Sequence, residues 1–164
     1  MIYFTADTHF GHANIIKYES RPFADTIEMD KEMVRRWNKV VQPKDETYII
    51  GDFLFGDGGY ANFILEKLNG RKYLIVGNHD SFLRDPLFDV DNFVWVKEYY
   101  RLNYQKQKIA LFHYPMVSWD CSFHGSIHLF GHVHSHPMPY QAPNSYNVGV
   151  DLHDFAPVPI SKYV

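Results

Sequence analysis

Seven side chains that can bind a metal ion follow short apolar runs in this chain of 164 residues. They combine imidazole nitrogens, carboxylates and one amide oxygen, a set that suits Mn, Fe, Zn or Ni better than Ca²⁺ or the soft, thiolate-seeking metals. Seven protein ligands are too many for one ion that keeps an open position, but they suit two ions that share a carboxylate. The candidate ligands are Asp7, His9, Asp52, Asn78, His113, His132 and His134.

The charge of such a centre indicates what it binds. Two divalent cations carry a charge of about +4, and the carboxylates of Asp7 and Asp52 contribute a charge of about −2. The surplus of about +2 attracts an anionic substrate and lowers the pKa of a water molecule held between the ions. The sequence therefore predicts a metal centre that activates water toward an anion.

Five apolar runs precede these ligands and predict buried strands. The runs are rich in β-branched and aromatic residues and do not alternate strictly with polar ones, as expected for strands covered on both faces. Because ligands of α/β proteins bind outside the carboxyl ends of strands, the runs would deliver their side chains to one rim. The runs are residues 2–6, 47–50, 73–76, 109–112 and 127–130.

A helical pattern lies between the first two runs. Asp25 and Glu28 resemble a capping box, apolar side chains then recur at spacings of three and four residues, and Pro43 ends the pattern. These features predict one amphipathic helix. Its apolar residues are Ile27, Met33, Val34, Trp37, Val40 and Val41.

A second helix is predicted over residues 60–68, with Gly70 just past its end. Residues 93–113 predict two β-runs that turn near residues 105–108. No repeat or linker divides the chain, so we expect residues 1–164 to form a single α/β domain. The inward side chains of the second helix are predicted to be Phe63, Ile64 and Leu68.

Composition argues against several partners. Sixteen Lys and Arg residues against 19 Asp and Glu residues give a formal net charge of −3, without the basic field that binds nucleic-acid backbones. No apolar stretch approaches the roughly 18 residues of a membrane span, and no basic segment of a secretory signal is seen. The single cysteine, Cys121, allows no internal disulfide. We expect a cytoplasmic protein with no membrane partner, and nucleic acid stays a possible but not a favoured partner.

Five short motifs within residues 7–134 carry a resemblance to a known family. The motifs are Asp7-Thr8-His9, Gly51-Asp52, Gly77-Asn78-His79-Asp80, His113 and Gly131-His132-Val133-His134. Each motif is weak alone, but in this order the five resemble the calcineurin-like metallophosphoesterase superfamily. Segments 7–12 and 113–115 also resemble the small bacterial and phage phosphoesterases of this group.

The resemblance implies a four-layer αββα sandwich, with two mixed β-sheets flanked by helices, and a centre of two divalent transition-metal ions. Mn is favoured among Mn, Fe, Zn and Ni. The first ion would be held by Asp7, His9, Asp52 and His134. The second ion would share Asp52 as a bridge and would also be held by Asn78, His113 and His132.

The implied activity is hydrolysis of a phosphodiester, or of a phosphomonoester, in a small phosphorylated substrate. A hydroxide bridging the two ions would attack phosphorus in line. His79 would stabilise the developing negative charge or protonate the leaving oxygen. Two alternatives stay open: a nuclease acting on DNA or RNA ends, and a non-catalytic scaffold similar to the phosphoesterase-like subunit of retromer.

The second and third motifs depart from those of protein Ser/Thr phosphatases. Residues 51–56 lack the Asp and Arg that follow the Gly-Asp pair in those enzymes, so a phosphoprotein is a poor substrate. Asp80 stands where those enzymes have Glu, which leaves open what orients His79. The end of the sequence at Val164 leaves little room for a cap domain, and this favours a phosphodiesterase.

Several residues near the motifs have two interpretations. His12 contacts phosphate or a neighbouring ligand, or it lies at the surface; Asp151 supports a ligand or occupies a strand-end turn. Arg21 and Arg84 clamp a second phosphate or are exposed charges. Packing is favoured over substrate stacking for most of Phe10, Phe53, Phe55, Tyr114, Trp119 and Tyr140. Hydrogen-bonded or solvated positions are expected for His124, His128, His136 and His153.

Overall fold

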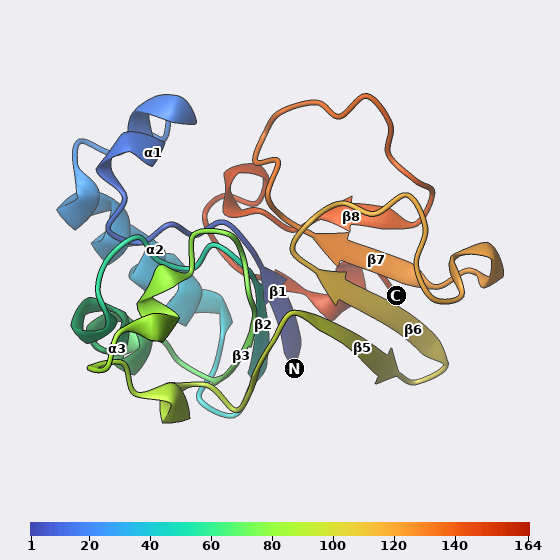
Figure 1. Ribbon diagram of the computed structural model, residues 1–164, viewed down its shortest axis with the longest axis horizontal. Coiled ribbons are helices and arrows are strands. Elements are labelled where there is room, and N and C mark those ends of the chain that lie inside the picture. The colour runs from blue at the N-terminus through green and yellow to red at the C-terminus, as the bar shows by residue number, and fades with distance from the viewer.

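Two β-sheets stack face to face in the computed structural model, which describes residues 1–164 (Figure 1). The first sheet has five strands in the order β4-β3-β2-β1-β9, and the second has four in the order β5-β6-β7-β8. The first contains β1 (Ile2–Thr5), β2 (Glu46–Ile50), β3 (Arg71–Ile75), β4 (Val96–Lys97) and β9 (Val158–Pro159). The second contains β5 (Tyr99–Tyr104), β6 (Gln107–Phe112), β7 (Ile127–Phe130) and β8 (Ser145–Asn147).

Three α-helices lie on one side of the molecule, next to the first sheet (Figure 1). They are α1 (Ala13–Tyr18), α2 (Thr26–Val40) and α3 (Gly58–Lys67). Short 3-10 helices occupy Ser81–Arg84, Val90–Asn92, Ser122–His124, Val150–Leu152 and Ile160–Lys162. None of the helices combines the length and the apolar character that a membrane crossing requires.

Both sheets are mixed, as predicted. Strands β1, β2 and β3 are parallel, with Ile2 opposite Glu46 and Glu46 opposite Arg71, while β9 joins β1 in the antiparallel sense. In the second sheet β6, β7 and β8 are parallel. The predicted hairpin is confirmed as β5 and β6, which pair up to Tyr104 opposite Gln107 at the turn.

The two faces of the first sheet bury two separate cores. One core of 18 buried residues lies between this sheet and the helices and includes Trp37, Phe53 and Leu74. The other, of 13 buried residues, lies between the two sheets and includes Phe4 and Leu111. Because β1, β2 and β3 are covered on both faces, their sequences read as nearly continuous apolar runs.

Helix α2 begins where the capping residues predict. The Asp25 side chain accepts a hydrogen bond from the Glu28 N–H at 2.8 Å, and Glu28 accepts one from the Ala24 N–H at 2.6 Å. Ile27 fits the helical spacing but is 77% exposed in the first turn of the helix. Its neighbours on the buried face, such as Met33, pack against the sheet instead.

Helix α3 begins two residues before the predicted start. The carboxylate of Asp57 caps it by accepting a hydrogen bond from the Tyr60 N–H at 2.7 Å. Ile64 and Leu68 are buried as predicted, but the prediction for Phe63 is wrong, because this residue is 51% exposed. Phe63 faces the gap between α2 and α3, where Lys67 lies over its ring at 4.4 Å.

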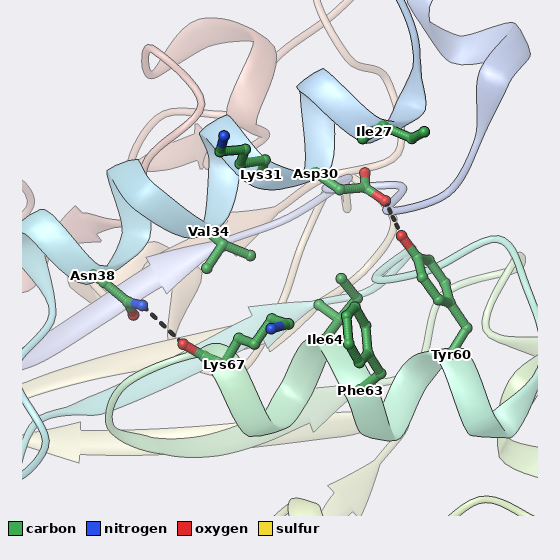
Figure 2. A pocket seen from close by; sticks show the side chains of 9 residues that line it. All are labelled: Ile27, Asp30, Lys31, Val34, Asn38, Tyr60, Phe63, Ile64 and Lys67. Carbon is green, nitrogen blue, oxygen red and sulfur yellow. Dashed lines mark hydrogen bonds between the residues drawn. The ribbon is translucent and has the colours of Figure 1, made fainter.

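A groove of about 670 Å³ separates α2 from α3, and Figure 2 shows the side chains that line it. At one end Tyr60 donates a hydrogen bond to Asp30, which also accepts the Gly11 N–H at 2.9 Å. At the other end Asn38 donates to the Lys67 carbonyl at 2.8 Å. The groove therefore lies behind the loop after β1, and Asp30 ties that loop to both helices.

Loops cover the outer face of the second sheet, where the resemblance implied α-helices. Ala110, Trp119 and Ala142 form a small buried cluster there, with Met116 packed against it. The regular structure in this cover is the 3-10 helix Ser122–His124. The helical layer is thus concentrated on the first sheet (Figure 1).

Candidate metal centre

Five of the seven predicted ligands follow the carboxyl ends of strands. Asp7 follows β1 and Asp52 follows β2; Asn78 follows β3. His113 follows β6 and His132 follows β7. Strands β1 to β3 are parallel to one another, and so are β6 and β7. The 3.1 Å between Asn78 Oδ1 and His113 Nε2 shows that the two sheets direct these residues to the same edge.

The candidate ligands form two clusters. The ligand atoms of Asp7, His9 and His134 lie within 4.8 Å of one another, and so do those of Asp52, His113 and His132. Asn78 joins the second cluster, because its Oδ1 lies 3.1 Å from His113 Nε2 and 3.1 Å from His132 Nδ1. All seven residues proposed from the sequence therefore meet in one place.

Asp52 belongs to the second cluster and also reaches the first. Its Oδ2 is 3.6 Å from Nε2 of His9 in the first cluster and 3.5 Å from Nε2 of His113 in the second. All three side chains are almost fully buried. A carboxylate in this position can serve two ions at once.

Five of the seven candidate ligands have left-handed backbones. A non-glycine residue in this region costs of order 1–3 kcal/mol and persists where the surrounding structure holds it, which is typical of functional sites. Consecutive loops here hold one another: Asp7 N–H donates to the Gly51 carbonyl at 3.0 Å and His9 N–H to the Asp52 carbonyl at 3.0 Å. The residues are Asp7 (φ 55°), His9 (φ 50°), Asp52 (φ 53°), His132 (φ 71°) and His134 (φ 49°).

Two motif glycines are required by close approach to the carboxylates. A Cβ on Gly77 would lie 2.3 Å from Asp52 Oδ1, and a Cβ on Gly131 would lie 2.7 Å from Asp7 Oδ2. Neither distance can be accommodated without moving the carboxylate. These glycines thus let the backbone of one loop pass directly against a candidate ligand on another loop.

The chemistry of the cluster fits divalent cations. His9 Nε2 is buried and has no hydrogen-bond partner, which is unfavourable for a polar atom. A bound metal ion would give this nitrogen a partner. Burial raises the pKa of Asp7 to about 7 and lowers the pKa of His9 to about 3, so His9 is neutral and able to donate its lone pair. Burial also opposes ionisation of Asp52, but His113, the His79 N–H that donates to it and His9 together outweigh burial and lower the pKa of Asp52 to about 2.

Two imidazoles are oriented by partners behind them. His113 Nδ1 lies 2.8 Å from the Ile50 carbonyl oxygen, which can only accept, so this nitrogen donates and Nε2 points toward Asn78 and Asp52. His134 Nδ1 lies 2.9 Å from Asp151 Oδ2. Such partners fix the tautomer and ring orientation of a metal ligand.

Metal ions should stabilise the fold, because they would neutralise Asp7 and Asp52 and engage His9 Nε2. At a free concentration of 100 times the dissociation constant, binding adds about 2.7 kcal/mol to the free energy of unfolding, which corresponds to about 5–10 °C in Tm. Calorimetry of the metal-free protein with added Mn²⁺ or Zn²⁺ measures this rise. Ca²⁺ is the control and should raise Tm less, since imidazoles are poor ligands for it. An unchanged Tm with Mn²⁺, Zn²⁺ and Ni²⁺ would contradict the assignment.

Arg21 is a structural residue, and neither interpretation from the sequence was right. It is 4% exposed, and its guanidinium binds both carboxylate oxygens of Asp151 at 2.8 and 3.1 Å. It also donates to the carbonyls of Asp7 and Thr8, each at 2.8 Å. Arg21 therefore joins the loop after β1 to the carboxylate behind His134, and it is unable to hold a second phosphate. Arg84 is exposed.

Asp80 braces the loops beneath the centre. Its carboxylate accepts backbone hydrogen bonds from Phe53 at 2.7 Å, Gly77 at 2.7 Å and Asp52 at 3.1 Å, and the residue is 5% exposed. Asp80 thus contacts the backbone and not the His79 ring. The segment that carries His79 is held by its own N–H, which donates to Asp52 Oδ1 at 2.8 Å.

An Asp80→Ala substitution should destabilise the protein by about 3 kcal/mol or more, because it leaves three buried N–H groups without their acceptor. Urea unfolding of the metal-free protein measures this loss without a contribution from metal binding. The control is Asp91→Ala, since Asp91 is exposed and should leave the free energy of unfolding nearly unchanged. Equal stability of the two variants would show that the backbone hydrogen bonds to Asp80 contribute little to the stability of the fold.

His79 and His12 lie over the first cluster. The His79 side chain is exposed, and its ring centroid lies 5.4 Å from that of His9. His12 is half-buried, with Nδ1 3.4 Å from Nδ1 of His9. Both are therefore beside the candidate ligands, with His79 on the open side.

His128 is fully buried and structural. Nδ1 lies 3.1 Å from the Ala110 carbonyl, and Nε2 accepts the Met116 N–H at 3.2 Å. It thus fixes the loop that follows His113. The other loop histidines are hydrogen-bonded or solvated as expected: His153 contacts the Asn147 carbonyl, while His124 and His136 are exposed.

Comparison with known proteins gives the class to which this fold and site belong. A family model described as calcineurin-like phosphoesterase matches residues 1–107, the part that carries the first three motifs. The chain belongs to the calcineurin-like phosphoesterase family. This assignment brings with it an expectation of divalent metal ions, and the two ligand clusters are where they would bind.

Relatives cover nearly the whole chain. The uncharacterized protein MJ1445 of Methanocaldococcus jannaschii is 36% identical over 170 residues, across 99% of this chain and 89% of its own. The Gene 66 protein of Mycobacterium phage D29 is 28% identical over 188 residues, across 96% and 92% of the two chains. The crystal structure of AQ665, a protein of unknown function from Aquifex aeolicus, superposes with a TM-score of 0.71 at 25% identity, across 96% and 94%.

Proposed function

We propose that this protein is a hydrolase of phosphodiester bonds in small phosphorylated molecules and that it works with two divalent transition-metal ions, with Mn favoured. The observation that carries the proposal is the position of Asp52. Its Oδ2 lies within 3.6 Å of one imidazole from each cluster, and one of these imidazoles has a buried nitrogen without any partner. That arrangement suits two adjacent cations better than one.

Each ion would be held by its own set of residues, and Asp52 would contact both ions. Asp7, His9 and His134 would hold the first ion together with Asp52, and Asn78, His113 and His132 would complete the second. When bound, the ions supply positive charge to the phosphate oxygens and lower the pKa of water. The buried carboxylates return only about half of that charge, so an anionic substrate is favoured at this edge of the sheet.

His79 is proposed as the residue that contacts the reacting phosphate. Its imidazole is exposed above the first cluster, while its backbone N–H is bound to Asp52. The backbone of His79 is therefore held next to the candidate ligands. Its imidazole is free to donate a proton to the leaving oxygen or a hydrogen bond to phosphate.

A diester is proposed over a monoester because of Arg21. A monoester carries a second negative charge near neutral pH, and an arginine beside the ions would serve to bind it. Arg21, in the segment after the first motif, is buried and engaged by Asp151 and two backbone carbonyls. Residues 51–56 also lack the Arg of the protein phosphatase motif.

Hydrolysis of bis(p-nitrophenyl) phosphate and of p-nitrophenyl phosphate by metal-stripped protein, before and after addition of Mn²⁺, tests the proposal. We expect turnover that depends on Mn²⁺ and is faster with the diester. No turnover with Mn²⁺, Zn²⁺, Ni²⁺ or Fe²⁺, although two ions are bound, would contradict it and favour a scaffold. DNA or RNA binding that weakens steeply with salt would favour a nuclease.

We also propose a cytoplasmic location. Its support is chemical, because the only thiol of the chain, Cys121, forms no disulfide and does not call for an oxidising compartment.

A further inference from the structure

Two aromatic residues beside the metal centre are exposed, whereas others next to the motifs are buried. Phe10 and Phe53 are fully buried in the core between the helices and the first sheet. Phe55 is 51% exposed and Tyr114 is 38% exposed. The preference for packing thus holds for Phe10 and Phe53, and Phe55 calls for a different explanation.

Phe55 lies flat on an imidazole of the site. Its ring stacks on that of His12 with a centroid distance of 4.4 Å and an angle of 18°. One face of the phenyl ring is therefore covered by His12, and the exposed surface lies on the other face and the edges. The Phe55 centroid is also 6.3 Å from that of His79.

The backbone around Phe55 is held in place. Phe55 N–H donates to the Phe10 carbonyl at 2.9 Å, and Phe10 N–H donates to the Phe53 carbonyl at 3.0 Å. These bonds join the Phe55 segment to the loop that carries His9 and His12. An aromatic ring that is already ordered loses little conformational freedom when a ligand packs on it.

The ring of Tyr114, unlike that of Phe55, is in contact with several neighbouring rings. The tyrosine ring contacts His132 and His113 edge to face, at centroid distances of 4.6 and 5.0 Å, and lies 5.6 Å from Phe112. It is wedged among its neighbours. Phe55 is the ring that offers a free flat surface.

We propose that Phe55, backed by His12, is a stacking platform for a flat heteroaromatic group on the substrate, such as the base of a nucleoside phosphodiester. The inference rests on the proposed phosphodiesterase function. With the phosphate beside His79, whose ring centroid lies 6.3 Å from that of Phe55, a ring carried on a substituent of the phosphate would be within reach of Phe55. Stacking tolerates any base, because every base has a π-face.

The substrates that test this share one leaving group. Thymidine 5′-(p-nitrophenyl phosphate) and methyl p-nitrophenyl phosphate are both diesters, and in each water adds to phosphorus, the P–O bond to p-nitrophenolate breaks, and a phosphate monoester remains. Only the substituent that stays on phosphorus differs. The Mn²⁺-loaded protein should prefer the thymidine ester about tenfold or more in kcat/KM, mainly through a lower KM.

Variants of Phe55 should change this preference. Phe55→Ala and Phe55→Leu should reduce the ratio of the two kcat/KM values to about 1, since leucine is apolar but not flat, and Phe55→Trp should retain the preference. The matched control is Phe63→Ala, because Phe63 is also 51% exposed but lies on α3 beside the groove. The control should leave the ratio unchanged.

Two results would overturn the proposal: a wild-type protein without preference for the thymidine ester, or a preference that survives in Phe55→Ala. If the methyl ester is still hydrolysed in a manner that depends on Mn²⁺, the platform is wrong and the phosphodiesterase function stands. If neither ester is hydrolysed with any of the metals, the proposed function fails and the platform fails with it.

Discussion

Asp52→Asn should prevent binding of the metal pair and lower turnover of a phosphodiester by at least about 100-fold. Removing the shared negative charge weakens the binding of both ions at once. The ions supply several kcal/mol of stabilisation to the transition state, so their loss slows the reaction. The fold should persist, because the asparagine carbonyl can still accept the His79 N–H that Asp52 Oδ1 now accepts at 2.8 Å. Metal content after Mn²⁺ loading and gel filtration measures the first effect, and initial rates measure the second.

Asp91→Asn is the matched control, since it removes the same charge from an exposed position. It should retain two ions and full activity. Two tightly held ions in Asp52→Asn, with activity close to that of the wild type, would show that Asp52 is not the shared ligand.

His79→Ala should keep both ions and slow hydrolysis by about 100-fold or more, the usual loss for a general acid. The metal content should not change, because the side chain lies outside both ligand clusters. The reason for the slower rate is the loss of a proton or hydrogen-bond donor beside the leaving oxygen. Mn²⁺ stoichiometry and kcat on the same sample measure the two properties together.

The leaving group distinguishes the two roles of His79. If it is a general acid, its loss should matter more for an alkyl diester than for a p-nitrophenyl diester, whose phenolate leaves without a proton. If it is only a phosphate contact, both substrates should slow equally. His124→Ala, which removes an exposed loop histidine, is the control. Loss of metal from His79→Ala, with the remaining rate per bound ion unchanged, would contradict its assignment to the phosphate.

The convergence of the candidate ligands could be predicted because it depends on short-range features of the chain. Each strand that precedes a candidate ligand contains an apolar run, and the residue that follows it must lie at a sheet edge. Once β1, β2 and β3 pair in parallel, Asp7, Asp52 and Asn78 come together without any further information. The same reasoning brings His113 and His132 from the second sheet.

The shortest helices and strands could not be predicted, because they are too short to show a periodic pattern of apolar residues. Helix α1 has six residues and buries only Ile15. Strand β9 has two residues, one of them Pro159, and exists because it pairs with β1. Ile27 and Phe63 fit the helical spacing, but they line the groove between α2 and α3 and so stay exposed.

Asp151 was considered from the sequence as a support of a ligand, but the roles of Arg21 and Asp80 were missed. Arg21 stands in a Ser-Arg-Pro segment that is typical of a surface loop, and nothing in that segment indicates an ion pair with Asp151, which is 130 positions away. The role of Asp80 depends on three backbone N–H groups whose convergence requires the folded loops. The left-handed backbones of ligands such as Asp7 and His9 are equally a property of the assembled loops.

The most direct measurement of the central claim is the anomalous diffraction of a Mn²⁺-loaded crystal at the manganese absorption edge. Our account predicts two peaks about 3.5–4 Å apart, with Asp52 contacting both, His9 beside one and His113 beside the other. A single peak, or two peaks of which only one lies within reach of Asp52, would contradict the shared-carboxylate centre.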